Sequence, residues 1–282
     1  METNILVAIK NLLNDPVTNI THYSQSGNRM NNMGESLESY VKDIFCNSLN
    51  EKDLKKKNEI YSEYFSYIGN QNNPPDVIIR NGDAVEIKKI ESLRAGIALN
   101  SSYPKDKLFV DSPMITNACK TCEDWQEKDL IYIIGSVKEG KLKALWFVYG
   151  DCYAAESEIY ERVKTKISKG INELSDVEFS DTNELGRVNK VDPLGITYLR
   201  IRGMWGIENP VKVFSDVISD VKETEFSVNA IMLAEKYNSF PEQDRKNIEQ
   251  LINNNFSIKN IKIKSPNNPA KLLNAKLFNY FR

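Results

Sequence analysis

Three side chains in two neighbouring apolar segments could together hold a metal ion and activate a water molecule. Asp76 stands at the head of one apolar run, and Glu86 and Lys88 lie two residues apart in the next. Side chains of a β-strand alternate between its faces, so Glu86 and Lys88 point the same way. Val85 and Ile87 then point the other way, into a core. Two carboxylates and an amine on one face are the groups that bind a divalent cation and position a water for hydrolysis.

The turn between the two runs decides whether the three groups share a face. Asn81-Gly82 between apolar runs indicates a β-hairpin. A two-residue turn would place Asp76 on the core face and split the site. A three-residue loop that starts at Arg80, with Gly82 in the left-handed conformation, would instead place Asp76 opposite Glu86. If the site is functional, the three-residue loop is the predicted one.

A helix predicted over residues 35–46 supplies a fourth candidate acid, Glu38. At about 100° per residue, Glu38 lies on the border of the apolar stripe and Glu35 lies on the solvated side. A border carboxylate can reach into a cleft, whereas a solvated one usually serves the helix N-terminus. Glu38 is therefore the better candidate, and the alternative is an ordinary surface glutamate. The stripe consists of Leu37, Tyr40, Val41 and Ile44, with Phe45 at its edge.

Composition and charge restrict the class of protein. The net charge of −2 excludes a basic footprint over the whole surface, but residues 256–282 contain six Lys or Arg and no acid. That basic segment is interpreted either as a solvated helix or as a contact for the DNA backbone. We expect a cytoplasmic chain, because no signal peptide and no membrane-spanning apolar run is evident.

The cysteines do not form a recognisable metal or redox motif. Cys119 and Cys122 make a single C-x-x-C, and the one histidine, His22, leaves a zinc site without further ligands. The context of an early βαβ unit that a redox motif requires is missing. All four cysteines are expected to be reduced and structural.

The remaining pattern predicts an α/β protein. Residues 130–134 and 142–149 are continuous apolar runs, typical of buried strands, and residues 155–169 and 242–251 are predicted helices. The segment between the two strands nearly matches a phosphate-binding loop, but Leu142 replaces the hydroxyl residue and no helix follows, so we predict a hairpin turn. The polar stretches 24–34 and 172–192 are predicted loops. We expect one domain over residues 1–282, with a mixed β-sheet flanked by helices.

One further predicted strand, residues 196–202, carries two arginines on one face. Tyr198, Arg200 and Arg202 share that face, and Gly203 to Gly206 then turns the chain. Two arginines side by side suit a phosphate or a guanine. The alternative is a pair of exposed surface arginines.

The sequence resembles a known nuclease family. The Pro75-Asp76 and Glu86-Ile-Lys88 motifs, with the hairpin between them, are similar to the PD-(D/E)xK nuclease pattern. Longer segments resemble the NgoPII family of type II restriction endonucleases, and the likeness runs from about residue 20 to past residue 210. These segments are residues 70–76, 86–90, 98–105, 111–119, 148–153 and 199–205.

The resemblance implies a restriction-endonuclease-like core and a Mg²⁺-dependent homodimer that cuts double-stranded DNA at a short palindrome, with GGCC the site associated with the family. It implies that Asp76 and Glu86 hold the metal with the Ile87 carbonyl, that Lys88 positions the attacking water, and that Glu38 assists. A cognate DNA methyltransferase is expected as a functional partner, and no membrane partner is expected. Expected DNA contacts are Asn28, Arg29, Ser101, Ser102, Tyr103, Lys105, Asn117, Lys120, Arg200 and Arg202.

Three alternatives remain open at this point. The same fold could serve repair or recombination without sequence specificity, and would then degrade a plasmid to a smear. A DNA-binding protein without catalysis would tolerate substitution of Asp76 and Lys88. A redox protein that uses Cys119 and Cys122 would lose its activity on Cys→Ser substitution.

Overall fold

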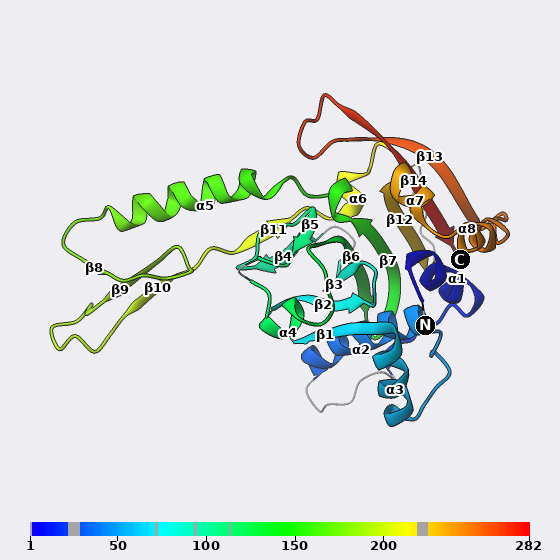
Figure 1. Ribbon diagram of the computed structural model, residues 1–282, viewed down its shortest axis with the longest axis horizontal. Helices are drawn as coiled ribbons and strands as arrows, with labels where there is room; N and C mark the ends of the chain where they lie inside the picture. Colours follow the sequence, from blue (N-terminus) through cyan, green and yellow to red (C-terminus); the bar gives the residue numbers. More distant parts are fainter. Residues whose placement is uncertain (1, 22–28, 71–72, 93–94, 113, 219–224) are drawn as a thin grey trace.

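The computed structural model describes residues 2–21, 29–70, 73–92, 95–112, 114–218 and 225–282. A large mixed sheet runs through the body of the molecule (Figure 1). Its strands, in spatial order, are β1 (Phe65–Asn70), β2 (Asn73–Ile79), β3 (Ala84–Ile90), β6 (Glu127–Lys138), β7 (Lys141–Tyr149), β12 (Ser227–Leu233), β14 (Leu272–Phe281) and β13 (Phe256–Lys264), and β5 (Lys107–Phe109) pairs with β6.

Helices cover the sheet, and two small sheets lie outside it. The helices are α1 (Ile5–Asn14), α2 (Arg29–Cys46), α3 (Leu54–Tyr64), α4 (Asn117–Lys120), α5 (Ser157–Asn172), α6 (Pro210–Val213), α7 (Ala234–Ser239) and α8 (Glu242–Glu249), with a 3₁₀ turn at Gly150–Cys152. The small sheets pair β4 (Ile97–Asn100) with β11 (Trp205–Ile207), and β9 (Gly186–Asn189) with both β8 (Glu178–Phe179) and β10 (Leu199–Ile201). The observed class, a mixed sheet flanked by helices, confirms the predicted α/β fold.

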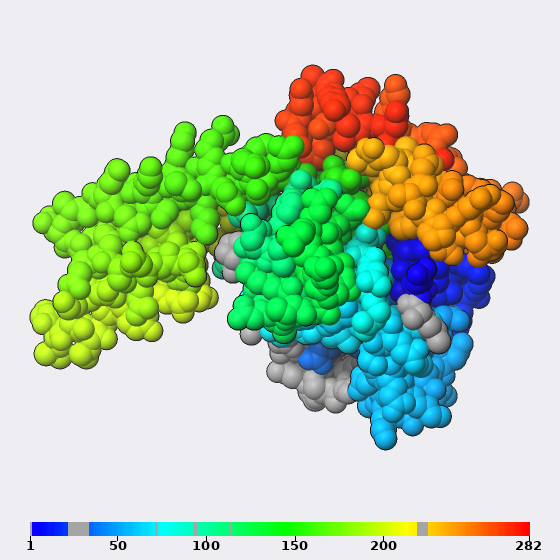
Figure 2. Space-filling view, viewed as in Figure 1, coloured from blue at the N-terminus to red at the C-terminus, as the bar shows by residue number. Residues whose placement is uncertain are grey.

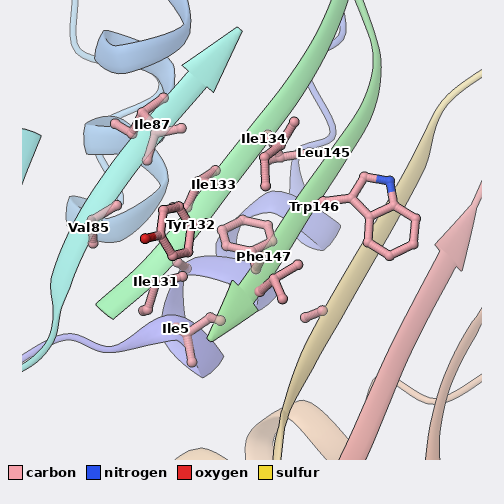
Figure 3. Close-up of a cluster of buried hydrophobic side chains, with 14 of the residues drawn as sticks. Ile5, Val85, Ile87, Ile131, Tyr132, Ile133, Ile134, Leu145, Trp146 and Phe147 are labelled. Atoms are coloured by element: carbon pink, nitrogen blue, oxygen red, sulfur yellow. The ribbon is translucent and has the colours of Figure 1, made fainter. Parts of the chain in front are cut away.

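The core lies between the central strands and the helices packed on them. The predicted apolar stripe of α2 is fully buried, and Leu37 packs so closely on β6 that a Cβ at Gly135 would lie 2.6 Å from its methyl carbons. Figure 3 shows side chains of β3, β6 and β7 in this core, with Ile5 of α1 among them. The predicted strands 130–134 and 142–149 are the middle of β6 and most of β7. Their two-residue turn, Glu139 and Gly140, has positive φ, as the hairpin prediction requires.

Residues 157–202, which we call the arm, project from the body (Figures 1 and 2). The arm consists of α5 and the three short strands β8, β9 and β10. An aromatic cluster joins it to the body: Tyr103 stacks on Tyr160 of α5 at 5.5 Å between ring centroids, and Trp205 meets both rings edge-on. Tyr103 also donates a hydrogen bond to Glu161 Oε1 (2.7 Å).

Several sequence-based boundaries were wrong. Residues 29–34 begin α2 instead of ending a loop. The segment 172–192 contains β8 and β9, and residues 205–207 form β11 instead of a turn. The basic segment 256–282 forms a two-stranded hairpin, so the helix interpretation is wrong. Its Ile and Lys residues alternate from Ile261 to Lys264, which suits a half-buried strand. None of the described helices is long and apolar enough to cross a membrane.

Candidate active site

The hairpin formed by β2 and β3 has the register that brings the candidate acids together. Val77 pairs with Val85 and Ile78 with Ala84, so Asp76 lies opposite Glu86. Ile79 N donates to Asp83 O (3.0 Å), which closes a three-residue loop. The loop prediction is thus confirmed, but Gly82 is not the left-handed residue. Asn81 takes that conformation, with φ of 55°, because asparagine tolerates it better than other side chains with a Cβ.

The backbone ladder between β2 and β3 stops at Val77 and Val85, just before the two acids. In an antiparallel pair, every second residue points its backbone N–H and C=O toward the neighbouring strand. The hydrogen bond to the Asp83 carbonyl shows that Asp83, Val85 and Ile87 do so toward β2, so the backbone groups of Ile87 point toward Pro75. Proline has no N–H to donate to the Ile87 carbonyl. The Ile87 N–H is bound by Asp76 Oδ2 instead (2.5 Å). Pro75 therefore donates no ladder hydrogen bond to the Ile87 carbonyl oxygen, and the N–H of Ile87 is bound by Asp76.

The three predicted groups converge on one face. Lys88 Nζ lies 2.5 Å from Glu86 Oε1, and both side chains are mostly shielded from solvent. Burial, together with the neighbouring Glu86 carboxylate, raises the pKa of Asp76 to about 8. Burial alone would lower the pKa of Lys88, but Glu86 and Asp76 outweigh it and raise that pKa. Lys88 is therefore an ammonium ion at neutral pH.

Glu38 lies behind this face. It lines a cavity of about 100 Å³ together with Asp76 and Ile87. Burial raises the pKa of Glu38, opposed by Lys42 and Lys88. Gly69 lines the same cavity, and a Cβ there would lie 2.4 Å from the Pro75 carbonyl oxygen, so only glycine lets β1 approach β2 at this point.

The donor set fits a divalent cation. Glu86 Oε2 is buried and has no hydrogen-bond partner among the described residues. Burial first and the neighbouring Glu86 carboxylate second raise the pKa of Asp76, and a cation between the two carboxylates would offset both effects. No group of three or more His, Cys, Asp or Glu side chains is clustered for a metal in the described parts of the chain. A site here would therefore rest on two carboxylates, a carbonyl and water.

A cleft of about 960 Å³ connects the acids to the arm. One side holds Asp76, Glu86 and Lys88, with Ser101 and Ser102 after β4. The other side is formed by the arm, which projects from the body (Figure 2). The arm residues that line the cleft include Lys164, Glu184, Arg187, Tyr198, Arg200 and Arg202.

The structure brings some predicted DNA contacts to this cleft and not others. Ser101, Ser102, Arg200 and Arg202 line it. Lys105 is 8% exposed and donates to Ser102 Oγ, and burial lowers its pKa to about 8 against the attraction of Glu86. Tyr103 is occupied by the aromatic cluster, and Asn117 and Lys120 lie on α4, which contacts β1. Asn28 and the Arg29 side chain lie outside the described residues.

Sequence reasoning missed three charged residues of the arm wall, Lys164, Glu184 and Arg187. Arg187 lies directly across from Arg200 in the β9–β10 ladder, and its guanidinium lies 4.6 Å from the centroid of the Tyr198 ring. Glu184 accepts hydrogen bonds from both Arg200 and Arg202. The alternation of polar and apolar residues at Arg187 and Val188 was a signal for a strand. That this strand pairs with β10 could not be predicted from the sequence.

The mixed sheet flanked by helices and the acid–acid–lysine face at the edge of an arginine-bearing cleft are features of an endonuclease. The comparisons with known proteins identify the kind: the chain belongs to the NgoPII restriction endonuclease family, whose model matches residues 3–264. The chain is 50% identical over 278 residues to the type II restriction enzyme NgoPII of Neisseria gonorrhoeae, a match that covers 98% of this chain and 99% of that protein. It is accordingly a type II restriction endonuclease. No solved structure matches it.

Proposed function

We propose that this enzyme hydrolyses phosphodiester bonds in double-stranded DNA with Mg²⁺ at the face formed by Asp76, Glu86 and Lys88. The observation that carries the proposal is the register of the β2–β3 hairpin, which places both carboxylates and the amine on one side of a cleft. The other side of the cleft carries three arginines, which suit a polyanion.

Asp76, Glu86 and the Ile87 carbonyl are the proposed ligands of the cation. Oxygen ligands of this kind suit Mg²⁺, which keeps several waters when bound. When bound, the ion supplies a water of lowered pKa and offsets charge on the phosphate. Asp76 must be ionised to act as a ligand, and its pKa of about 8 without metal means that binding releases a proton.

Lys88 orients the attacking water and does not take its proton. A general base near neutral pH needs a pKa close to that pH, whereas the pKa of Lys88 is raised by its two acidic neighbours. Its ammonium group can donate to the water and to a phosphate oxygen. Glu38, across the small cavity from the hairpin, would act through a bound water or a second cation.

A palindromic site would be read by a twofold homodimer, each copy cutting one strand. The family resemblance suggests GGCC as the site. We propose that the whole chain forms one catalytic domain. The host DNA would be protected by a cognate methyltransferase that is not part of the complex.

Plasmid digestion tests this function. Purified enzyme is incubated with plasmid DNA and Mg²⁺, and the fragment ends are sequenced. Discrete fragments that share a short palindrome at every end support the proposal. A smear indicates a nuclease without sequence specificity, and intact plasmid at all metal and enzyme concentrations contradicts cleavage.

A further inference from the structure

The arm wall of the cleft contains a group of three charged side chains that the cleavage chemistry does not use. Arg200 donates to Glu184 from Nε (3.0 Å, to Oε2) and from Nη2 (2.7 Å, to Oε1). Arg202 donates from Nε to the same Oε1 (2.5 Å). All three residues line the cleft.

This arrangement fixes one edge of each guanidinium and leaves its outer end open. A guanidinium carries its N–H donors in a rigid plane, so anchoring the Nε edge also orients the terminal nitrogens. Within the part of the chain that the structure describes, no hydrogen bond engages Nη1 of Arg200 or either terminal nitrogen of Arg202. The Glu184 side chain is 17% exposed, whereas those of Arg200 and Arg202 are 48% and 54% exposed. The carboxylate is thus set back in the wall, and the arginines reach beyond it.

The carboxylate also indicates what the arginines bind. A bidentate pair within a network can add some stability to the arm, but that role does not use the open terminal nitrogens that line the cleft. An arginine that binds a phosphate gains from its full positive charge. Glu184 partly cancels that charge, and its carboxylate also repels a phosphate. A guanine edge is neutral and offers two acceptors, O6 and N7, that match two parallel N–H groups of one arginine.

We infer that Glu184, Arg200 and Arg202 form a guanine-reading element in the cleft, with the arginines contacting base edges and Glu184 as the residue that positions them. This inference rests on the proposed function, because it requires DNA in the cleft. It assigns part of the sequence specificity to the arm, a part of the chain separate from the cleaving hairpin.

Base analogues test the inference. Duplexes containing the cleavage site found by end sequencing are prepared with each guanine in turn replaced by 7-deazaguanine, which lacks the N7 acceptor. Affinity is measured without divalent metal, so that no cutting occurs. Wild-type protein is expected to lose roughly tenfold to a hundredfold in affinity at the guanines that are read. Arg200→Lys and Arg202→Lys, which keep the charge but not the planar fork, are expected to remove that loss at the guanine that each reads.

Glu184→Gln and a matched control complete the experiment. Glu184→Gln keeps the shape of the side chain, so we expect unchanged thermal unfolding but a smaller 7-deazaguanine effect. Its affinity for unrelated DNA should rise, because the variant removes a negative charge from the cleft. Arg162→Lys on α5 is exposed and is not among the residues lining the cleft, and it is expected to behave as wild type.

Two results would overturn the inference. The variants could retain the full 7-deazaguanine effect, or Arg202→Lys could weaken binding to all duplexes alike and reduce the salt slope by about one, as expected for a phosphate contact. In both cases wild-type cleavage at a discrete site would still stand. Failure of the wild-type protein to cut any plasmid would instead refute the proposed function, and this inference with it.

Discussion

Replacing Asp76 by asparagine should stabilise the metal-free protein at alkaline pH while abolishing cleavage. Asp76 lies beside Glu86, and burial with that neighbour raises its pKa from 3.8 to about 8. A shift of about four pKa units corresponds to on the order of 5 kcal/mol at 1.36 kcal/mol per unit. An asparagine carries no charge, and its side-chain oxygen can still accept the hydrogen bond from Ile87 N.

The sign follows from the direction of the shift. Because the pKa of Asp76 is higher in the folded state, its protonated form stabilises the fold at acidic pH. That stability is lost as the pH rises from 3.8 through about 8. The free energy of unfolding of Asp76→Asn minus that of wild type should therefore increase by roughly 4 kcal/mol between about pH 5 and about pH 9.

Urea unfolding in the presence of EDTA measures this difference at each pH. Glu91→Gln is the matched control, because Glu91 follows β3 but its side chain is 73% exposed. We expect the control to show no such pH dependence. Excess Mg²⁺ should stabilise wild type and not Asp76→Asn, since only the wild type has both carboxylates. A difference between Asp76→Asn and wild type that stays constant, or falls, with rising pH would refute the electrostatic account of the site.

Three further predictions follow from other contacts. Lys88→Met should lower the single-turnover cleavage rate by about 10² to 10³, the usual effect of losing one positioned donor, while leaving metal-free DNA binding within a few fold, and an unchanged rate would exclude Lys88 from the chemistry. Lys236→Met should lower the free energy of unfolding by about 3 to 5 kcal/mol, because Lys236 bridges Asp83 and Asp129 (2.6 Å each) and its loss leaves the buried Asp83 without a counter-charge, with only the Tyr149 hydroxyl donating to it. Chemical denaturation checks this, and a loss below about 1 kcal/mol contradicts it. Tyr103→Phe removes the hydrogen bond from Tyr103 to Glu161, one of the contacts between the body and the arm, and should speed limited proteolysis within the arm; equal proteolysis rates would show that this bond does not hold the arm.

The register of the β2–β3 hairpin could be predicted because its determinants are local. Strand alternation places Glu86 and Lys88 on the same face of the sheet, and the length of the loop decides whether Asp76 is on that face too. The identity of the left-handed residue, Asn81 and not Gly82, could not be predicted, because both residues accept that conformation and the contacts of the loop decide between them. The position of Glu38 at the border of a buried stripe could be predicted from helical periodicity, and Glu38 lines the small cavity with Asp76.

The arm could not be predicted because its pairing is not local. β9 and β10 are separated by a loop of nine residues, so no tight-turn signal connects Arg187 to Arg200. Lys105 was assigned to DNA from its polar neighbours, but the backbone around it is held by the buried Tyr132 hydroxyl, and its amine is turned inward. In both cases, tertiary contacts determine the position of a charged side chain that composition alone placed on the surface.

The central claim is that Asp76 and its partners on the hairpin cut DNA. Its most direct test is the single-turnover cleavage rate of a duplex containing the site found by end sequencing, measured with Mg²⁺ for wild type, Asp76→Asn and Glu91→Gln. The account predicts no detectable cleavage by Asp76→Asn and a rate for Glu91→Gln within about twofold of wild type, because surface substitutions away from a site change energies little. Cleavage by a well-folded Asp76→Asn protein at the wild-type rate would contradict it.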